Sequence, residues 1–98
     1  MTLEEITDRI RSIAAQHEGR FQETAKFQFE DGMVYLNDTV SPVVVSNEEK
    51  GAACTIKMKN EDFEKLLEGN LNVMGAVMSG RLRIRGSKRV AQKLTSLF

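Results

Sequence analysis

The stretch LNVMGAVMSGRLRIRG, residues 71–86, joins an apolar helical segment to a strictly alternating strand segment. Residues 73–78 are apolar except for one glycine, and residues 81–85 alternate arginine with leucine or isoleucine. Asn72 can cap a helix here, and Gly80 can end it. A surface helix in a small protein normally has a polar face. We therefore predict that the helix over 73–78 is covered on all sides, either by core packing or by a bound molecule.

Upstream of this stretch, the sequence predicts a helix, a β-hairpin and an edge strand. A capping box begins the segment TLEEITDRIRSIAAQ, residues 2–16, in which apolar residues recur at helical spacing. Residues 25–36 alternate polar and apolar side chains and turn at Asp31-Gly32. This pattern predicts two antiparallel strands joined by a two-residue type I′ turn. A third strand over 41–47 contains a proline, which favours an edge position.

The remaining segments predict one more strand and two more helices. Residues 54–59 alternate in strand register. Asn60 can cap a helix over 61–69, and Ser87 can cap a last helix over 88–98. No repeat or linker interrupts the chain. The pattern therefore predicts a single α+β domain over residues 1–98, with the helices segregated to one face of the sheet.

The composition is that of a folded globular protein, with 41% hydrophobic and 29% charged residues. No run of about 18 apolar residues occurs, so no transmembrane helix is expected. The first residues are acidic and amphipathic, unlike a signal or transit peptide. The single cysteine, Cys54, excludes an internal disulfide. Together these features predict a cytoplasmic protein.

The sequence contains no reactive side chain with the neighbours that catalysis requires. The one histidine, His17, lies at a helix C-terminus, where its charge suits the helix dipole. Cys54 alternates in phase with Ile56, as a small buried hydrophobe does. Adjacent acids at 48–49 and 61–62 have no basic or metal-ligating neighbour. We therefore predict no enzymatic activity, no catalytic residue, no metal and no cofactor.

Basic side chains gather toward the C-terminus of the sequence, where residues 81–98 contain no acid. Three arginines lie on one face of their strand, and two lysines join them if the two strands pair. These residues are Lys57, Lys59, Arg81, Arg83 and Arg85. The row is either a solvated face whose charge protects a sheet edge or a docking site for an anionic membrane surface or a phosphate-bearing headgroup. No aromatic residue is interleaved among them, so nucleic acid is not a predicted partner.

The segment LTSLF places Leu94, Leu97 and Phe98 on one side of the predicted last helix. Large apolar residues at such a position need a surface to dock on. They either complete the core or close the mouth of a cavity. Met74 and Met78, four residues apart, leave a similar choice between core packing and an adaptable contact with a ligand.

Over residues 44–98, the sequence resembles the sterol carrier protein type 2 domain family. Members of that family read SNE, an A-x-C-T-I-like strand, a D-F helix, G-x-L-N-P-M, M-S-G-K-L-K-I-x-G and K-L-x-x-L-F. The matching positions here are Ser46, Asn47, Glu48, Cys54, Thr55, Ile56, Asp62, Phe63, Gly69, Leu71, Asn72, Met74, Met78, Ser79, Gly80, Leu82, Ile84, Gly86, Lys93, Leu94, Leu97 and Phe98. The KFQFEDGMVYL hairpin also fits the first two strands of the family. In three departures, Val73 replaces the usual proline, Val77 a frequent phenylalanine and Ser87 a common aspartate.

The resemblance implies a five-stranded, mostly antiparallel sheet with helices packed on one face and an apolar tunnel between the layers. It implies a non-enzymatic domain that binds or carries a fatty acid, a fatty acyl-CoA or a sterol-like lipid. The lipid-contacting residues would be Phe27, Phe29, Ile56, Met58, Phe63, Leu66, Val73, Met74, Val77, Met78, Leu82, Ile84, Leu94, Leu97 and Phe98. The alternative is an interaction module of the same fold, with its interior filled by its own side chains, used for dimerisation or as an accessory subunit.

Overall fold

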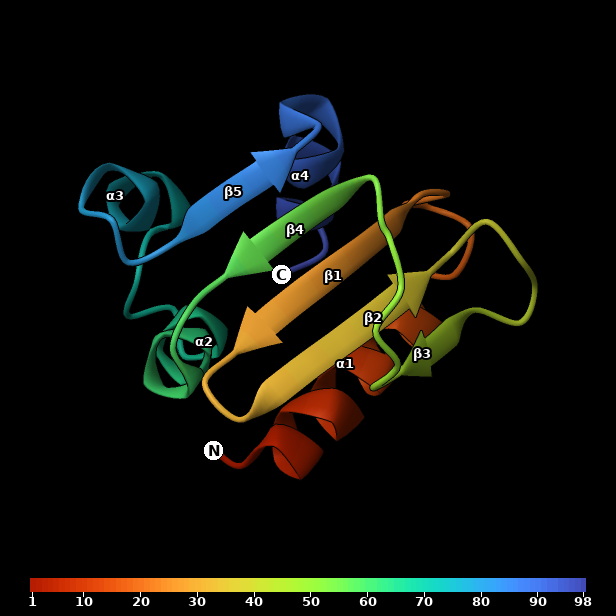
Figure 1. Ribbon diagram of the computed structural model, residues 1–98, viewed down its shortest axis with the longest axis horizontal. Helices are drawn as coiled ribbons and strands as arrows, with labels where there is room; N and C mark the ends of the chain where they lie inside the picture. Colours follow the sequence, from red (N-terminus) through yellow and green to blue (C-terminus); the bar gives the residue numbers. More distant parts are fainter.

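In the computed structural model, which describes all of residues 1–98, the chain forms a five-stranded sheet and four helices, and one face of the sheet carries no helix (Figure 1). The elements are α1 (Leu3–Gln16), β1 (Thr24–Phe29), β2 (Gly32–Asn37), β3 (Val44–Ser46), β4 (Cys54–Lys57), α2 (Asn60–Leu67), α3 (Val73–Met78), β5 (Arg83–Gly86) and α4 (Lys88–Thr95). The strand order is β3-β2-β1-β4-β5. β1 and β4 run parallel, and the other neighbouring strands are antiparallel. The predicted α+β fold with a five-stranded, mostly antiparallel sheet is confirmed.

The hydrophobic core lies between the sheet and the helices behind it in Figure 1. α1 packs on β2 and β3, and α4 packs on β1, β4 and β5. Because side chains alternate along a strand, the neighbours Phe27 and Ile56 face the helices and are each 2% exposed. Lys26 and Lys57 point to the opposite face of the same strands. None of the helices is both long and apolar enough to cross a bilayer.

The connection from β3 to β4, residues 47–53, crosses the sheet face that carries no helix (Figure 1). Lys26 donates to the Glu49 carboxylate at 2.8 Å, and the Lys50 ammonium lies 5.6 Å from the centre of the Tyr35 ring. These contacts hold the connection over β1 and β2. The half of this face formed by β4 and β5 therefore remains open.

Side-chain and glycine caps fix the starts of α1, α3 and α4 and the end of α3 where the sequence predicts them. The amide of Glu5 donates to the Thr2 hydroxyl at 3.2 Å, and the amide of Thr2 donates to the Glu5 carboxylate at 3.0 Å. Asn72 and Ser87 each accept a hydrogen bond from the amide three residues later. Gly80 follows α3 with a φ of +81°. The predicted capping box, both other caps and this glycine stop are confirmed.

The hairpin turn differs from the prediction. Phe29 pairs with Gly32, so the two-residue loop is Glu30-Asp31, and neither loop residue has a positive φ. The predicted type I′ turn at Asp31-Gly32 is therefore wrong, since that turn needs positive φ at both central residues. Gly32 is instead the first residue of β2. Its φ is +152°, and a Cβ there would lie 2.6 Å from Cδ2 of Leu3, so glycine suits this position.

The start of α2 also differs by one residue. The N-cap is Lys59, which makes no capping hydrogen bond with its side chain. Asn60, the predicted cap, is the first helical residue, and its amide group donates to the Met1 carbonyl and to the Asp31 carboxylate, both at 3.1 Å. Its side chain therefore links the N-terminus and the hairpin loop instead of capping the helix.

The last strand and the last helix are shorter than predicted. β5 begins at Arg83 because the amides of Arg81 and Leu82 donate back to the Ala76 carbonyl, at 2.9 and 3.1 Å. These bonds keep the residues before Arg83 wound against α3. α4 ends at Thr95, so the final apolar residues lie beyond the helix.

Candidate functional site

α3 lies at the edge of the molecule, beside β5 in Figure 1. Among its side chains only Ala76 is buried. Met74 is 70% exposed, Met78 is 83% exposed and Val77 is 37% exposed. Core packing is therefore wrong for the two methionines, and the other elements of the chain leave most of the helix uncovered.

A small apolar cavity lies between the sheet, α2 and α4. Its volume is about 20 Å³, and nine of its ten lining residues are hydrophobic. The lining residues are Phe27, Ile56, Met58, Phe63, Leu66, Val73, Leu82, Leu94, Thr95 and Phe98. All of them except Thr95 belong to the predicted lipid-contacting set. Alternation in the strands and helical spacing in α2 and α4 bring these residues together from distant parts of the sequence.

The other predicted lipid-contacting residues lie outside the cavity lining. Phe29 is buried next to it, with its ring centre 5.6 Å from that of Phe63. Ile84 and Leu97 are partly buried against the same core. The three exposed side chains of α3 do not reach the cavity.

Phe98 lies over the outer side of the cavity. Its ring stands edge-on to Phe27 and to Phe63, with ring centres 5.7 and 5.9 Å apart. It remains 39% exposed. Its amide donates to the Thr95 carbonyl at 3.3 Å. The residue is therefore held mainly by its ring.

The size of the cavity limits what this structure can hold. A space of 20 Å³ accommodates about one water molecule. Pockets for small organic ligands measure roughly 300–1,000 Å³. The structure shows the apolar residues expected of a tunnel wall gathered in one place, but it does not show the tunnel.

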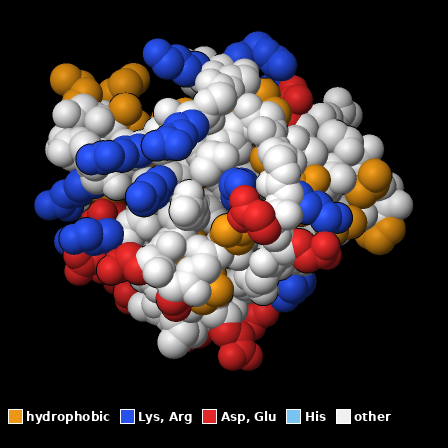
Figure 2. All heavy atoms as spheres, in the orientation of Figure 1, with side chains coloured by type: hydrophobic (Ala, Val, Ile, Leu, Met, Phe, Trp, Pro, Cys, Tyr) orange, Lys and Arg blue, Asp and Glu red, His pale blue; other side chains and the backbone are white.

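The open half of the sheet face is basic. Lys57 pairs directly with Arg83, and Thr55 pairs with Arg85. None of the three cations is among the residues that form salt bridges. Figure 2 shows lysine and arginine side chains in a band over β4 and β5. Because like charges directly opposite each other destabilise a sheet, this arrangement carries a cost in stability.

A cleft of about 360 Å³ opens where this basic face meets the connection from α3 to β5. Phe29 and Met58 contribute its apolar surface, and Glu30 is its one acid. Its basic residues are Lys57, Lys59, Arg81 and Arg83. The Arg81 guanidinium lies 3.9 Å from the buried Asp62 carboxylate. Four of the five residues predicted to dock on anionic surfaces thus surround one cleft.

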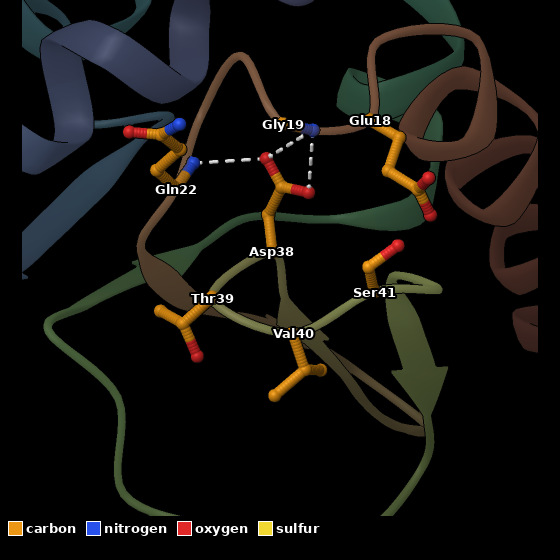
Figure 3. Close-up of a pocket in the computed structure, with 7 residues that line it drawn as sticks. All are labelled: Glu18, Gly19, Gln22, Asp38, Thr39, Val40 and Ser41. Atoms are coloured by element: carbon orange, nitrogen blue, oxygen red, sulfur yellow. Dashed lines mark hydrogen bonds between the residues drawn. The ribbon is translucent and has the colours of Figure 1, made fainter.

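A polar pocket beside the end of α1 was not predicted from the sequence (Figure 3). At its base the buried Asp38 carboxylate accepts hydrogen bonds from the amides of Gly19 at 2.9 and 3.1 Å, Phe21 at 3.0 Å and Gln22 at 2.8 Å. Backbone donors therefore occupy both oxygens, and the residue anchors the loop between α1 and β1. No sequence signal separates Asp38 from the other acids of the chain.

The two residues considered as reactive groups are held in ordinary structural roles. Burial raises the pKa of the Cys54 thiol, so the thiol stays protonated at neutral pH. Nδ1 of His17 lies 2.9 Å from the Ile13 carbonyl at the end of α1. Neither residue lines the apolar cavity or the basic cleft.

The sequence matches one family of known proteins. The model of the SCP-2 sterol transfer family matches residues 8–98. Over 54 residues the chain is 41% identical to sterol carrier protein 2 of Homo sapiens, a match that covers 55% of this chain and 10% of that protein. The matched segment is thus a small part of that relative.

Solved structures share the fold at lower identity. The sterol carrier protein domain 2 of Helicoverpa armigera has a TM-score of 0.80 at 19% identity, covering 95% of this chain and 82% of that one. The palmitated SCP2L2 of Aedes aegypti has a TM-score of 0.71 at 18% identity, covering 99% of this chain and 94% of that one. At these identities the likeness shows the fold alone.

Proposed function

The chain belongs to the SCP-2 sterol transfer family, and from that premise we propose that it binds a single lipid molecule between its sheet and its helices and carries it unchanged. Family membership supports lipid or sterol binding and transfer in general. The finer proposal is a fatty acid, a fatty acyl-CoA or a sterol-like lipid in the space around the apolar cavity. The observation that carries it is the convergence of nine hydrophobic side chains on that one small space.

Binding a lipid requires this space to widen. Phe98 is the wall residue best suited to move, because it lies beyond α4 and is 39% exposed. If its ring swings away from Phe27 and Phe63, an acyl chain can take its place against the same aromatic edges. The palmitated Aedes aegypti relative, which shares the fold, carries a ligand of this class. A fatty acyl chain is therefore the first ligand to test.

The predicted lipid-contacting residues outside the cavity would extend the wall as the space widens. Phe29, Ile84 and Leu97 adjoin the present lining and would meet the ligand first. Met74, Val77 and Met78 would meet it only if α3 moved inward. The residues Lys57, Lys59, Arg81, Arg83 and Arg85 would bring the protein to an anionic membrane, where lipid is collected or released.

A second candidate function is favoured by the small volume of the cavity. With about 20 Å³ of free space, the interior is nearly filled by its own side chains. A domain with such an interior could serve as a dimerisation or accessory module. The two candidates differ in one property, the ability to take up lipid.

The test measures uptake of a fluorescent fatty-acyl probe and its displacement by unlabelled palmitate. Leu66, a partly buried cavity residue, is changed to Trp to fill the space. Val40→Trp is the matched control, because it adds the same side chain at an exposed position outside the lining and outside the predicted lipid-contacting set. We expect probe affinity to fall by about tenfold or more in Leu66→Trp, with no change in Val40→Trp. Thermal unfolding confirms that both variants are folded.

Native mass spectrometry of the purified protein gives an independent reading of bound lipid. Wild-type protein that neither binds the probe nor retains lipid would overturn the carrier proposal and leave the accessory module. Equal probe affinity in wild type and folded Leu66→Trp would place the lipid elsewhere.

A further inference from the structure

We infer that α3 is an insertion element that enters the interface of an anionic bilayer, with the basic residues of the neighbouring cleft binding lipid phosphates beside it. The inference rests on the proposed contact with anionic membranes and names the segment that makes it. It does not depend on whether the protein carries lipid.

The first observation is the concentration of exposed apolar surface on α3. Half of the large hydrophobic residues that are exposed anywhere in the chain lie on this one short helix. Met74, Val77 and Met78 project from it, and Ala76 is its one buried side chain. Contiguous apolar side chains on a surface mark an interaction site. Methionine is suited to this role because its flexible side chain adapts to irregular surroundings.

The second observation is that local hydrogen bonds cap α3 at both ends although only one of its side chains is buried. The Gly75 amide donates to the Asn72 side chain at 3.1 Å, and the Ser79 hydroxyl donates to the Ala76 carbonyl at 3.2 Å. Two amides from the connection to β5 also donate to Ala76. The apolar side chains are therefore presented on a hydrogen-bonded helix, not on an irregular loop.

The third observation is the charge around the helix. Residues 69–80 contain no charged side chain, whereas Arg81 follows at once and shares the adjoining cleft with Lys57, Lys59 and Arg83. Figure 2 shows hydrophobic side chains at the α3 corner next to the band of lysine and arginine. This arrangement is complementary to an anionic bilayer, because the acyl region and the phosphates lie at adjacent depths. The apolar side chains would contact the acyl region, and the cations would contact the phosphates.

The length of α3 sets how it would bind. Six helical residues extend about 9 Å, far less than a bilayer core of about 30 Å. The helix would therefore lie in the headgroup region, with its methionines directed toward the acyl chains and the cations level with the phosphates.

A second copy of the chain is a poorer occupant of this surface. A twofold dimer places the same patch of both subunits together, which would bring the cations of the two clefts close to one another. Three side chains also cover much less area than the roughly 1,200–2,000 Å² buried in a stable interface. Anionic lipid headgroups, in contrast, neutralise the cations.

The experiment uses the absence of tryptophan from the chain. Met74→Trp places a single indole on α3, and Val40→Trp is the matched control, since Val40 is 46% exposed outside this patch. Each variant is mixed with vesicles of phosphatidylcholine alone or of phosphatidylcholine and phosphatidylserine in a two-to-one ratio. We expect a blue shift of the indole emission and quenching by brominated lipid for Met74→Trp with the anionic vesicles only, weakened by salt.

A second variant measures the contribution of the helix to affinity. The double change Met74→Gln and Met78→Gln removes apolar surface from exposed positions, so the fold should persist. We expect its binding to anionic vesicles to weaken by about tenfold or more, whereas Val40→Gln should not change it. Thermal unfolding of both variants checks that they remain folded.

The outcomes separate this inference from the proposals on which it builds. Vesicle binding by wild type without an emission shift in Met74→Trp, or with unchanged affinity in the double variant, overturns insertion of α3 while membrane contact stands. No binding of wild type to anionic vesicles overturns both. Concentration-dependent dimerisation that is lost in the double variant would assign the surface to a second copy. Failure of probe binding alone would overturn only the lipid carrier.

Discussion

The ring of Phe98 stands edge-on against the ring of Phe27, with ring centres 5.7 Å apart and planes inclined by 70°. Phe98 makes a similar contact with Phe63 at 5.9 Å. The residue that lies beyond α4 therefore rests on the strand at the centre of the sheet and on α2. It also forms one side of the apolar cavity.

Removing this ring should speed the release of a bound lipid and lower the stability of the fold only modestly. We expect Phe98→Ala to lower the free energy of unfolding by about 1–2 kcal/mol, because two edge-to-face contacts are lost from a side chain that is partly exposed. Release of a fatty-acyl probe should become faster, as measured by stopped-flow fluorescence. Phe98→Leu, which keeps an apolar cover, is the control and should release the probe at a rate between those of Phe98→Ala and wild type. An unchanged release rate in both variants would give Phe98 a purely structural role.

A different prediction concerns Gly86, the last residue of β5. Its φ is +87°, and a Cβ would lie 2.6 Å from the Ala53 carbonyl oxygen. Because the obstacle is backbone, Gly86→Ala should destabilise the protein by about 3 kcal/mol or more, from backbone strain and the clash together.

Gly69 provides the matched control for this change. Its φ is +76°, and a Cβ added there would meet no atom within 4 Å. Gly69→Ala should therefore cost only the backbone strain, about 1–2 kcal/mol. Chemical unfolding measures both variants, and equal losses would show that the close approach of Ala53 does not matter.

Alternation and helical spacing were sufficient to predict the elements and the side chains that face the core, whereas the family resemblance implied the cavity. Phe27 and Ile56 could be assigned to the inner face because side-chain period in a strand follows directly from backbone geometry. The exposed methionines could not be foreseen. A helix that is apolar all round is expected to be buried, but the sequence pattern does not say whether the chain's own side chains or another molecule bury it. Asp38 was missed because its role depends on amides from a loop that folds onto it.

The starts of α2 and β5 differ from the predicted starts for one physical reason, which is competition from contacts outside each element. Asn60 is a good capping residue, yet its amide group is drawn to Met1 and Asp31. The segment before β5 has ideal alternation, yet its first amides bond to the carbonyl of Ala76. Local propensity fixes the kind of element, and such contacts decide where it begins.

The last prediction concerns Glu23, whose carboxylate joins the start of β1 to α4. Hydrogen bonding from Lys93, at 3.3 Å, and the charges of Lys93 and Arg89 hold the pKa of Glu23 below its ordinary value of 4.5. A carboxyl group whose pKa is lower in the folded state stabilises that state above its unfolded pKa, and the stabilisation is lost as pH falls through the folded pKa. Wild type should therefore be more stable than Glu23→Gln at neutral pH, and the difference should shrink below about pH 4.5. Chemical unfolding across this range checks it, with Glu4→Gln as the control for removing an exposed acid that forms no ion pair. A difference that stays constant down to about pH 3 would show that the ion pairs to α4 do not contribute.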